Sequence, residues 1–246
     1  MARRDEIVAF ANELLDVDAW PDYGPMGMQV VGADEVRKIA CGVSASLELF
    51  ERASDADAQL LVVHHGLFLH KRPTIVDLRL RHRLEALFDS DLTLLAYHLA
   101  LDAHPEVGNN ACLARELGVE VERPFAEIGI GGRVAPTPAE ELVGRIRERV
   151  SREALVFADG PPVVERVAIS SGKSGHDLAR AAAEGYEVFL TGEAEEESVY
   201  VARELGIHFV AAGHYATERL GVQALAARVA ERFDVDWEFV EVPNPV

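Results

Sequence analysis

The apolar positions of this chain follow two periods that alternate along its length. Short apolar runs rich in β-branched residues are typical of buried strands, and stretches with an apolar residue at every third or fourth position are typical of amphipathic helices. The predicted strands cover residues 37–43, 59–64, 92–98, 163–171, 187–191, 208–213 and 235–242. The predicted helices cover residues 3–16, 47–53, 77–88, 108–117, 138–150, 175–185, 195–205 and 216–233.

Strands that alternate with helices in this way predict an α/β fold with largely parallel strand pairing. Residues 123–138 contain a GIGG stretch and prolines, which indicate a junction between two halves. We therefore expect a first domain over residues 1–125 and a second over residues 126–246, with the C-terminal part of the second able to pack back onto the first.

Side chains that can bind metal follow three of the predicted strands. The chain reads HHG after the second strand, HLALD after the third and GHYATE after the sixth. Ligands of open α/β sheets lie beyond the carboxyl ends of the strands, so these three segments predict one site. The i, i+4 spacing in GHYATE places its histidine and its glutamate on one helical face. The candidate metal ligands are His64, His65, Asp102, His214 and Glu218.

The residue types of this set indicate which ions it binds. Imidazole nitrogen suits Zn, Fe, Ni and Co, and carboxylate oxygen suits harder ions such as Mn. Five ligands exceed what one open catalytic site takes, but they fit two ions about 3.5–4 Å apart that share a bridging carboxylate, from Glu218 or Asp102. We predict two divalent ions per chain (Zn, Fe, Mn, Ni or Co). His70, His82 and His208 lack this context, and a single histidine is more often a packed or exposed residue than a ligand.

Two further loops carry polar residues after a strand. Residues 170–175 read SSGKSG, but Val167 stands where a Walker A loop requires its first glycine, so this is not such a loop. A tight turn that needs glycine is the favoured interpretation, and an anion held by backbone amides is the alternative. After the strand 187–191, Glu193 either contacts a substrate or caps the following helix.

The charge balance excludes some partners. The chain has 42 acidic and 24 basic residues and a net charge of −18, whereas binding to nucleic acid requires clustered basic residues. The negative charges of such a chain repel one another, and high salt screens this repulsion, which suggests a halophile-like protein. The alternative is an ordinary acidic protein whose acidic residues lie on solvated helix faces. The two cysteines lie far apart, without zinc-site spacing. No apolar run is long enough to span a membrane and the first residues lack a signal-peptide pattern, so we expect a cytoplasmic protein.

Four stretches of the chain resemble the Nif-three-like family, also named GTP cyclohydrolase 1 type 2 homologues. They read YGPMGMQVVG, VVHHGLF, YHLALDAHPEVGNNACLARELG and TGEAEEESVYVARELGIHFVAAGHYATERLG, and the resemblance spans essentially the whole length. It implies two α/β domains with mixed, largely parallel sheets, a dinuclear metal centre in the cleft between them, and a ring-shaped homohexamer.

The resemblance also implies a role for each candidate ligand. It makes His65 and Asp102 ligands of one ion, His64 and His214 ligands of the other, and Glu218 the bridge. His98 then does not bind an ion itself but orients a ligand or a metal-bound water. One departure is Met26, where relatives often carry asparagine, which removes a polar side chain near the expected cleft.

Three functions are compatible with these residues. The first is a metal-dependent hydrolase of a nucleotide-like or phosphorylated small molecule, in which two ions activate water and stabilise an oxyanion while His98 or Glu193 relays protons. The second is a metal storage or delivery protein, or a ring-shaped assembly in which the metal is structural and whose surface binds protein partners without turnover. The third is a regulatory scaffold that needs no metal. The resemblance to GTP cyclohydrolase favours the first.

Overall fold

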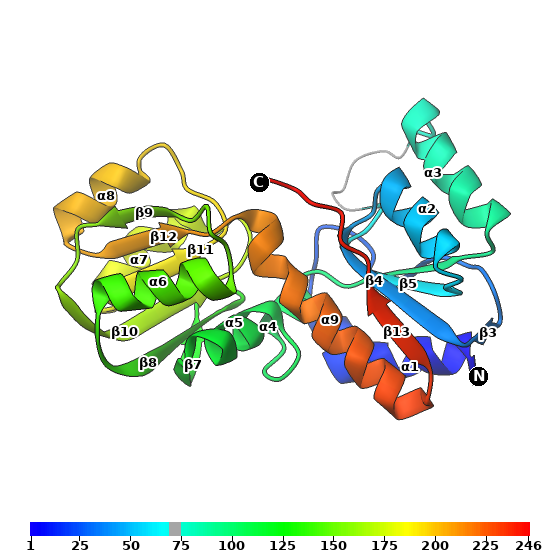
Figure 1. Cartoon of the computed structure of the whole chain (residues 1–246), viewed down its shortest axis with the longest axis horizontal. Helices are drawn as coiled ribbons and strands as arrows, with labels where there is room; N and C mark the ends of the chain where they lie inside the picture. Colours follow the sequence, from blue (N-terminus) through cyan, green and yellow to red (C-terminus); the bar gives the residue numbers. More distant parts are fainter. Residues whose placement is uncertain (69–74) are drawn as a thin grey trace. The chain divides into compact units, whose positions relative to one another are not determined.

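The structure is a computed structural model that describes residues 1–68 and 75–246. Residues 69–74, which include His70 and Lys71, lie outside the described residues. The predicted α/β fold is confirmed: the described chain forms two compact units, and each surrounds a sheet of its own (Figure 1). Unit 1 comprises Met1–Leu101 and Gly221–Pro243, and unit 2 comprises Asp102–Leu220 and Asn244–Val246. Among the described residues, no helix combines the length and apolar character needed to cross a bilayer.

Unit 1 contains a five-stranded sheet in the order β13-β4-β5-β6-β2. Strands β4, β5, β6 and β13 pair in parallel, and β2 pairs with β6 in antiparallel fashion. The central strands are buried along nearly their whole length, as expected for parallel strands that are covered on both faces. The strands are β2 (Gly27–Val30), β4 (Lys38–Ser44), β5 (Leu60–His65), β6 (Thr93–Ala96) and β13 (Asp236–Phe239), with a two-residue pair β1 (Ala2–Arg3) and β3 (Glu35–Val36) beside them.

Helices α2 (Leu47–Asp55) and α3 (Leu78–Asp89) cover one face of the sheet of unit 1. Their buried residues, among them Phe50 and Leu87, form a cluster with alternate residues of β5 and β6. Both helices begin at a capping side chain: Ser46 accepts a hydrogen bond from Leu49 N at 3.2 Å, and Asp77 accepts one from Leu80 N at 2.8 Å. The other helical segments of this unit are α1 (Arg4–Leu15), the short η1 (Val17–Ala19) and parts of α4 (Leu99–Ala103) and α9 (His214–Phe233).

Unit 2 contains a six-stranded mixed sheet in the order β7-β8-β10-β11-β12-β9. Strands β10, β11 and β12 are parallel to one another, whereas β7, β8 and β9 join by antiparallel pairing. The bounds are β7 (Glu120–Phe125), β8 (Gly129–Pro138), β9 (Leu155–Ala158), β10 (Val163–Ser170), β11 (Val188–Thr191) and β12 (His208–Ala211). Its further helices are α5 (Asn109–Leu117), α6 (Ala139–Arg149), η2 (Gly175–Asp177), α7 (Leu178–Ala183) and α8 (Ser198–Leu205).

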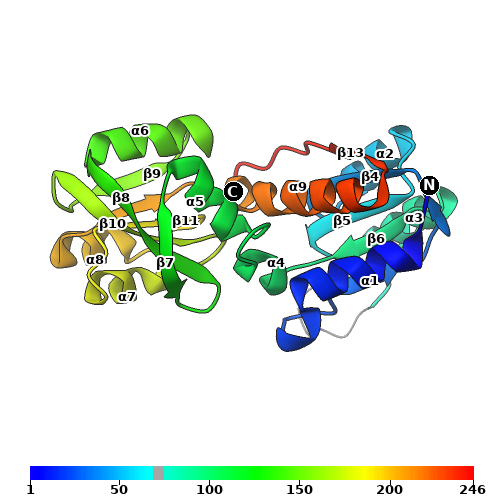
Figure 2. The ribbon, with the colours of Figure 1, turned by 90° about the horizontal axis from the view of Figure 1, so that it is seen from below.

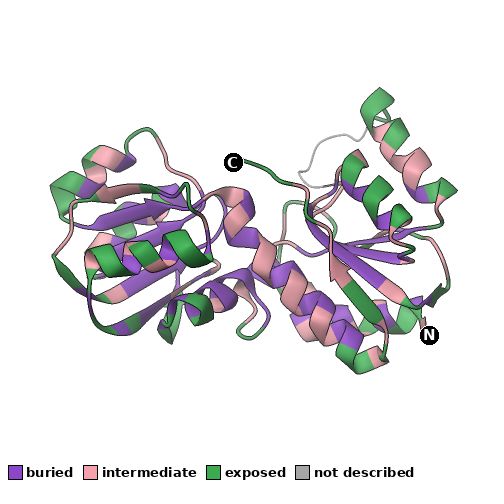
Figure 3. Ribbon diagram, viewed as in Figure 1, coloured by how far each residue is buried: buried purple, intermediate pink, exposed green. Residues whose placement is uncertain are grey.

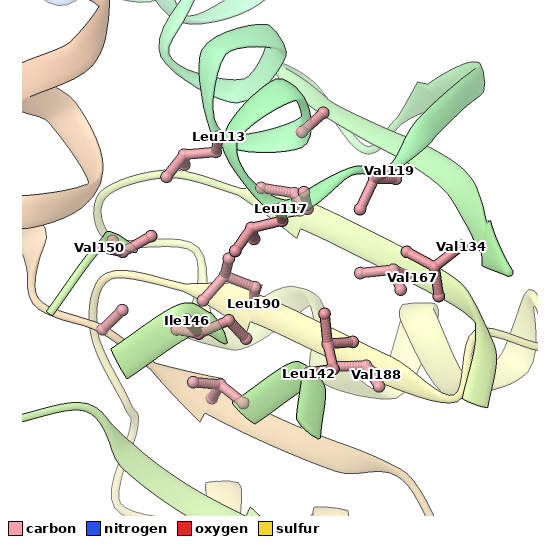
Figure 4. Close-up of a cluster of buried hydrophobic side chains, with 14 of the residues drawn as sticks. Leu113, Leu117, Val119, Val134, Leu142, Ile146, Val150, Val167, Val188 and Leu190 are labelled. Atoms are coloured by element: carbon pink, nitrogen blue, oxygen red, sulfur yellow. The ribbon is translucent and has the colours of Figure 1, made fainter. Parts of the chain in front are cut away.

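Successive side chains along these strands point to opposite faces of the sheet, so unit 2 has two apolar layers, one on each face. Val188 and Leu190 pack with α5 and α6 (Figure 4), as does Val210, and the alternate residues Phe189 and Phe209 pack with α7 and α8. Figure 2 shows α6 on one side of this sheet and α7 and α8 on the other. Figure 3 shows that the strands of this sheet are largely buried, whereas the helices carry both buried and exposed residues.

The segment 123–138, expected to be a junction, instead forms the second half of strand β7 and all of strand β8 in the unit 2 sheet. Its glycines serve close packing. A Cβ on Gly131 would overlap the Tyr186 hydroxyl, and a Cβ on Gly132 would overlap the backbone oxygen of Glu120. Glycine here reflects the close approach of neighbours in a sheet, which a sequence pattern cannot distinguish from a flexible linker.

Candidate functional site

Strand β5 of unit 1 ends in two of the predicted ligands. His64 is fully buried and its Nδ1 donates to the backbone oxygen of Tyr97 at 2.8 Å. His65 Nδ1 lies 3.0 Å from the Ser44 hydroxyl oxygen. Gly66, which follows them, has no positive φ; glycine gives space here, because a Cβ would lie 2.6 Å from Ala96 Cβ and would overlap the end of the Gln29 side chain. Gln29 in turn accepts a hydrogen bond from Leu67 N at 2.7 Å and so holds the turn after the two histidines.

His98 follows strand β6 and lies against the same two histidines. One ligand atom from each of His64, His65 and His98 lies within 4.8 Å of the others. His98 Nδ1 donates to Asp22 Oδ1 at 2.8 Å, and the side chain of Asp22 is almost completely buried. Burial favours the neutral form of Asp22, but hydrogen bonds from His98, Leu99 N and Tyr23 N outweigh it and lower the pKa of this carboxyl group.

Helix α9 begins at His214 and presents its first turn within unit 2. His214 Nε2 lies 3.0 Å from Glu218 Oε2, so the predicted shared helical face is confirmed. On its other side, His214 Nδ1 donates to Glu193 Oε1 at 2.5 Å. Glu193 therefore orients a predicted ligand. It does not cap helix α8, whose N-cap is Glu197.

Asp102 is held in unit 2 by three neighbouring side chains. Its Oδ1 accepts from Asn109 Nδ2 at 2.8 Å and from the Ser171 hydroxyl at 3.0 Å. Its backbone oxygen accepts from Asn110 Nδ2 at 3.2 Å. Asp102 and Glu218 are only 2% and 3% exposed, and each offers a carboxylate oxygen within 4.8 Å of the other. Two buried carboxylates at this separation form a strong acceptor site for cations.

The turn after strand β10 lies against Glu218, and the residue of the turn at this contact is a glycine. Gly172 has φ +64°, and a Cβ on it would overlap Glu218 Oε1 and lie 3.4 Å from His214 Nε2. Its oxygen accepts hydrogen bonds from Gly192 N at 2.9 Å and from Glu193 N at 3.1 Å. The favoured interpretation of SSGKSG as a turn that needs glycine is therefore confirmed.

The charge of His214 is set by its two acidic neighbours. Burial lowers its pKa, but the hydrogen bonds and charges of Glu218 and Glu193 outweigh burial and raise the pKa of His214 to about 9. At neutral pH a proton on His214 thus balances part of the negative charge of this cluster.

We expect the metal-free protein to lose stability as the pH rises from about 6.5 to about 9. The pKa of His214 in the folded chain, about 9, exceeds its ordinary value of 6.5, so its stabilising contribution is complete below pH 6.5 and is lost as the pH rises through 9. Urea midpoints measured in chelator at both ends of this range should differ more in the wild type than in His214→Ala. The exposed His82→Ala is the control, and the same pH dependence in all three proteins would contradict this expectation.

Several residues of these clusters were not predicted from the sequence. Asp22, Ser44 and Ser171 contact predicted ligands from segments remote in the chain. Asn109 and Asn110 carried a signal, since both lie in the LDAHPEVGNN stretch, but their roles as donors to Asp102 depend on the fold.

Comparison with known proteins identifies the family of this chain. The family model described as Duf34/NIF3 (NGG1p interacting factor 3) matches residues 2–245. The chain belongs to this family. Duf34/NIF3 relatives include proteins named GTP cyclohydrolase 1 type 2 homolog from Pseudomonas aeruginosa, 42% identical over 97% of both chains, and from Escherichia coli, 41% identical over 99% of both. The predicted resemblance is thereby confirmed.

Solved structures of Duf34/NIF3 relatives share the whole fold. A structure described as protein ybgI, of unknown function, superposes with a TM-score of 0.95 at 40% identity over 100% of both chains. The protein TTHA1606 from Thermus thermophilus gives 0.94 at 36% identity over 100% of both chains. Reduced HcgD from Methanocaldococcus jannaschii gives 0.86 at 23% identity over 98% of both chains and supports the fold alone.

Proposed function

We propose that this protein is a divalent-metal-dependent hydrolase with a dinuclear centre that acts on a nucleotide-like or phosphorylated small molecule. The proposed ligands are His64, His65, Asp102, His214 and Glu218. The observation that carries the proposal is the pair of buried carboxylates in unit 2, Asp102 and Glu218, within 4.8 Å of each other. Buried carboxylates are stable when they are paired with a cation or bind a metal ion, which supports a metal site at this pair.

The donor set fits first-row divalent ions. Unit 1 offers imidazole nitrogens and unit 2 offers carboxylates with one imidazole, the mixture that such ions accept. When bound, two such ions would lower the pKa of water and stabilise negative charge on a reacting oxygen. Hydrogen bonds within each unit hold these donors in place: Ser44 holds His65, Asn109 holds Asp102 and Glu193 holds His214. His98 and Glu193 are the predicted proton-transfer groups.

The substrate class rests on similarity to relatives. Two relatives above 40% identity are named GTP cyclohydrolase 1 type 2 homolog, which makes GTP the first compound to test. The ring-shaped homohexamer implied by the resemblance is part of the proposal and is tested by light scattering at high salt. The acidic surface predicts no nucleic-acid partner.

The decisive test is turnover by the metal-loaded protein. We expect hydrolysis of GTP, or of a member of a nucleotide and phosphoester panel, after loading with Zn, Mn, Fe, Co or Ni. His65→Ala and Glu218→Ala should reduce the rate to that of buffer, since each removes a ligand. The exposed residues His82 and Glu196 provide matched controls, and His82→Ala and Glu196→Ala should keep the wild-type rate. Bound ions without turnover on any compound would contradict the enzyme assignment and favour metal storage or delivery.

A further inference from the structure

Helix α3 of unit 1 carries two different charge arrangements. Arg81 Nε lies 2.7 Å from Glu85 Oε1, the stabilising arrangement of opposite charges four residues apart. Arg79 and Arg83 have the same spacing, but both are basic, and like charges at this spacing destabilise a helix. Residues four apart lie on the same face of a helix, so α3 holds two neighbouring positive charges on one face.

Arg83 is the more costly member of this pair. Its side chain is half-buried, and its Nε atom is buried without a hydrogen-bond partner in the part of the chain that the structure describes. Burial and the positive charge of Arg79 lower the pKa of Arg83, and the charge of Asp77 opposes them only in part. A guanidinium group nevertheless stays charged at neutral pH. Arg83 thus holds a partly desolvated positive charge, and buried charges in proteins are typically paired.

The start of α3 does not offset these charges. Asp77 is engaged as the cap of the helix, because its Oδ1 accepts a hydrogen bond from Leu80 N at 2.8 Å. The first turn of α3 contains no acidic residue and instead contains Arg79, although the partial positive charge of a helix N-terminus favours acids there. Arg79 and Arg83 therefore have an electrostatic cost that an external anion would remove.

The chemistry of the two side chains indicates which anion fits them. Each guanidinium group offers its N–H donors in a planar fork that matches the oxygens of carboxylates and phosphates. A carboxylate has one negative charge and two oxygens, so one arginine satisfies it. A phosphate monoester carries about −1.5 to −2 charges at neutral pH and has three oxygens that accept hydrogen bonds. A phosphate group therefore matches the charge and the donors of both arginines.

We propose that Arg79 and Arg83 form a binding site on helix α3 for the phosphate group of a small molecule. Arg79 is exposed and accessible to such a ligand, and the phosphate supplies the charge partner that Arg83 lacks. The site gives a chain of net charge −18 a local positive surface toward a phosphorylated ligand. Neither arginine is a proposed metal ligand or proton-transfer group, so the inference holds or fails independently of the proposed function.

The test measures how pyrophosphate changes the urea midpoint of the full chain. The protein is first freed of metal with chelator and gel filtration, because bound ions would themselves bind pyrophosphate. We expect pyrophosphate to raise the midpoint of the wild type, and acetate at equal ionic strength to raise it less. Arg79→Gln and Arg83→Gln should each weaken pyrophosphate binding about 10-fold or more. Arg81→Gln is the matched control on the same helix and should keep the wild-type affinity, because Arg81 is already paired with Glu85.

A second variant distinguishes binding from a purely structural role of Arg83. In phosphate-free buffer, Arg83→Met should unfold at the same or a higher urea concentration than the wild type, because it removes a charge without a partner. It should also lose the response to pyrophosphate. A lower midpoint of Arg83→Met in phosphate-free buffer would show that the arginine stabilises the fold itself and would overturn the inference. An unchanged midpoint of the wild type in pyrophosphate, or an equal response of wild type, Arg79→Gln and Arg83→Gln, would overturn it as well.

Discussion

Gly172→Ala should weaken metal binding by about 100-fold, the upper end of the effects seen when groups that position a metal ligand are changed. The added Cβ would lie 2.2 Å from Glu218 Oε1, which is an overlap, and 3.4 Å from His214 Nε2. Glu218 is 3% exposed, so its carboxylate has little room to move aside without leaving its place beside Asp102. The left-handed backbone at φ +64° adds a cost of about 1–2 kcal/mol to folding for any residue other than glycine.

Gly144→Ala is the matched control for this prediction. Gly144 lies inside helix α6 of the same unit, and a Cβ there meets nothing within 4 Å. Alanine at this position should keep the wild-type metal affinity and stabilise the chain by about 0.5–1 kcal/mol. Competition titrations with a metal-binding dye and urea unfolding measure the two effects. Equal metal affinity for Gly172→Ala and Gly144→Ala would show that the turn does not position Glu218.

Asn110→Leu should lower the free energy of unfolding by about 3 kcal/mol or more, since each buried polar group left without a partner costs about 1–3 kcal/mol. The side chain of Asn110 is completely buried and bonds to three backbone groups. It donates to the oxygens of Asp102 at 3.2 Å and Ile128 at 3.0 Å, and it accepts from Ser171 N at 2.8 Å. Leucine of similar size would leave all three groups without this partner.

The control for Asn110→Leu is Asn244→Leu, because Asn244 is exposed and belongs to the same unit. Urea unfolding followed by circular dichroism should show a much lower midpoint for the first variant and an unchanged midpoint for the second. A loss below about 1 kcal/mol for Asn110→Leu would mean that water or a local shift replaces these hydrogen bonds.

The elements with a clear period were predictable from the sequence. Strands β4, β5, β10, β11 and β12 lie where apolar runs predicted them, because buried strands must be apolar on both faces. Strand β7 was missed because its residues are mostly exposed and carry charge. Strand β8 was missed because glycine and proline in a sheet resemble those in a loop. The second sheet is consequently less parallel than expected.

For the candidate ligands, the sequence predicted only the arrangement of residues that lie close together along the chain. His214 and Glu218 share a helical face at a spacing of four residues, which any helix dictates. The partners that orient the ligands come from distant segments: Asp22 lies 76 positions before His98, and Ser171 lies 69 positions after Asp102. No periodic pattern connects such pairs, so the roles of Asp22, Ser44, Asn110 and Ser171 required the structure.

The most direct test of the account is the number of metal ions in the purified protein. The chain should be purified at high salt without chelator, reloaded with Zn or Mn, freed of loosely bound ions by gel filtration, and analysed by elemental mass spectrometry. We expect about two ions per chain, because five ligands exceed what one open catalytic site takes and would suit two ions. Fewer than one ion per chain after reloading would contradict the claim that these histidines and carboxylates form a metal centre.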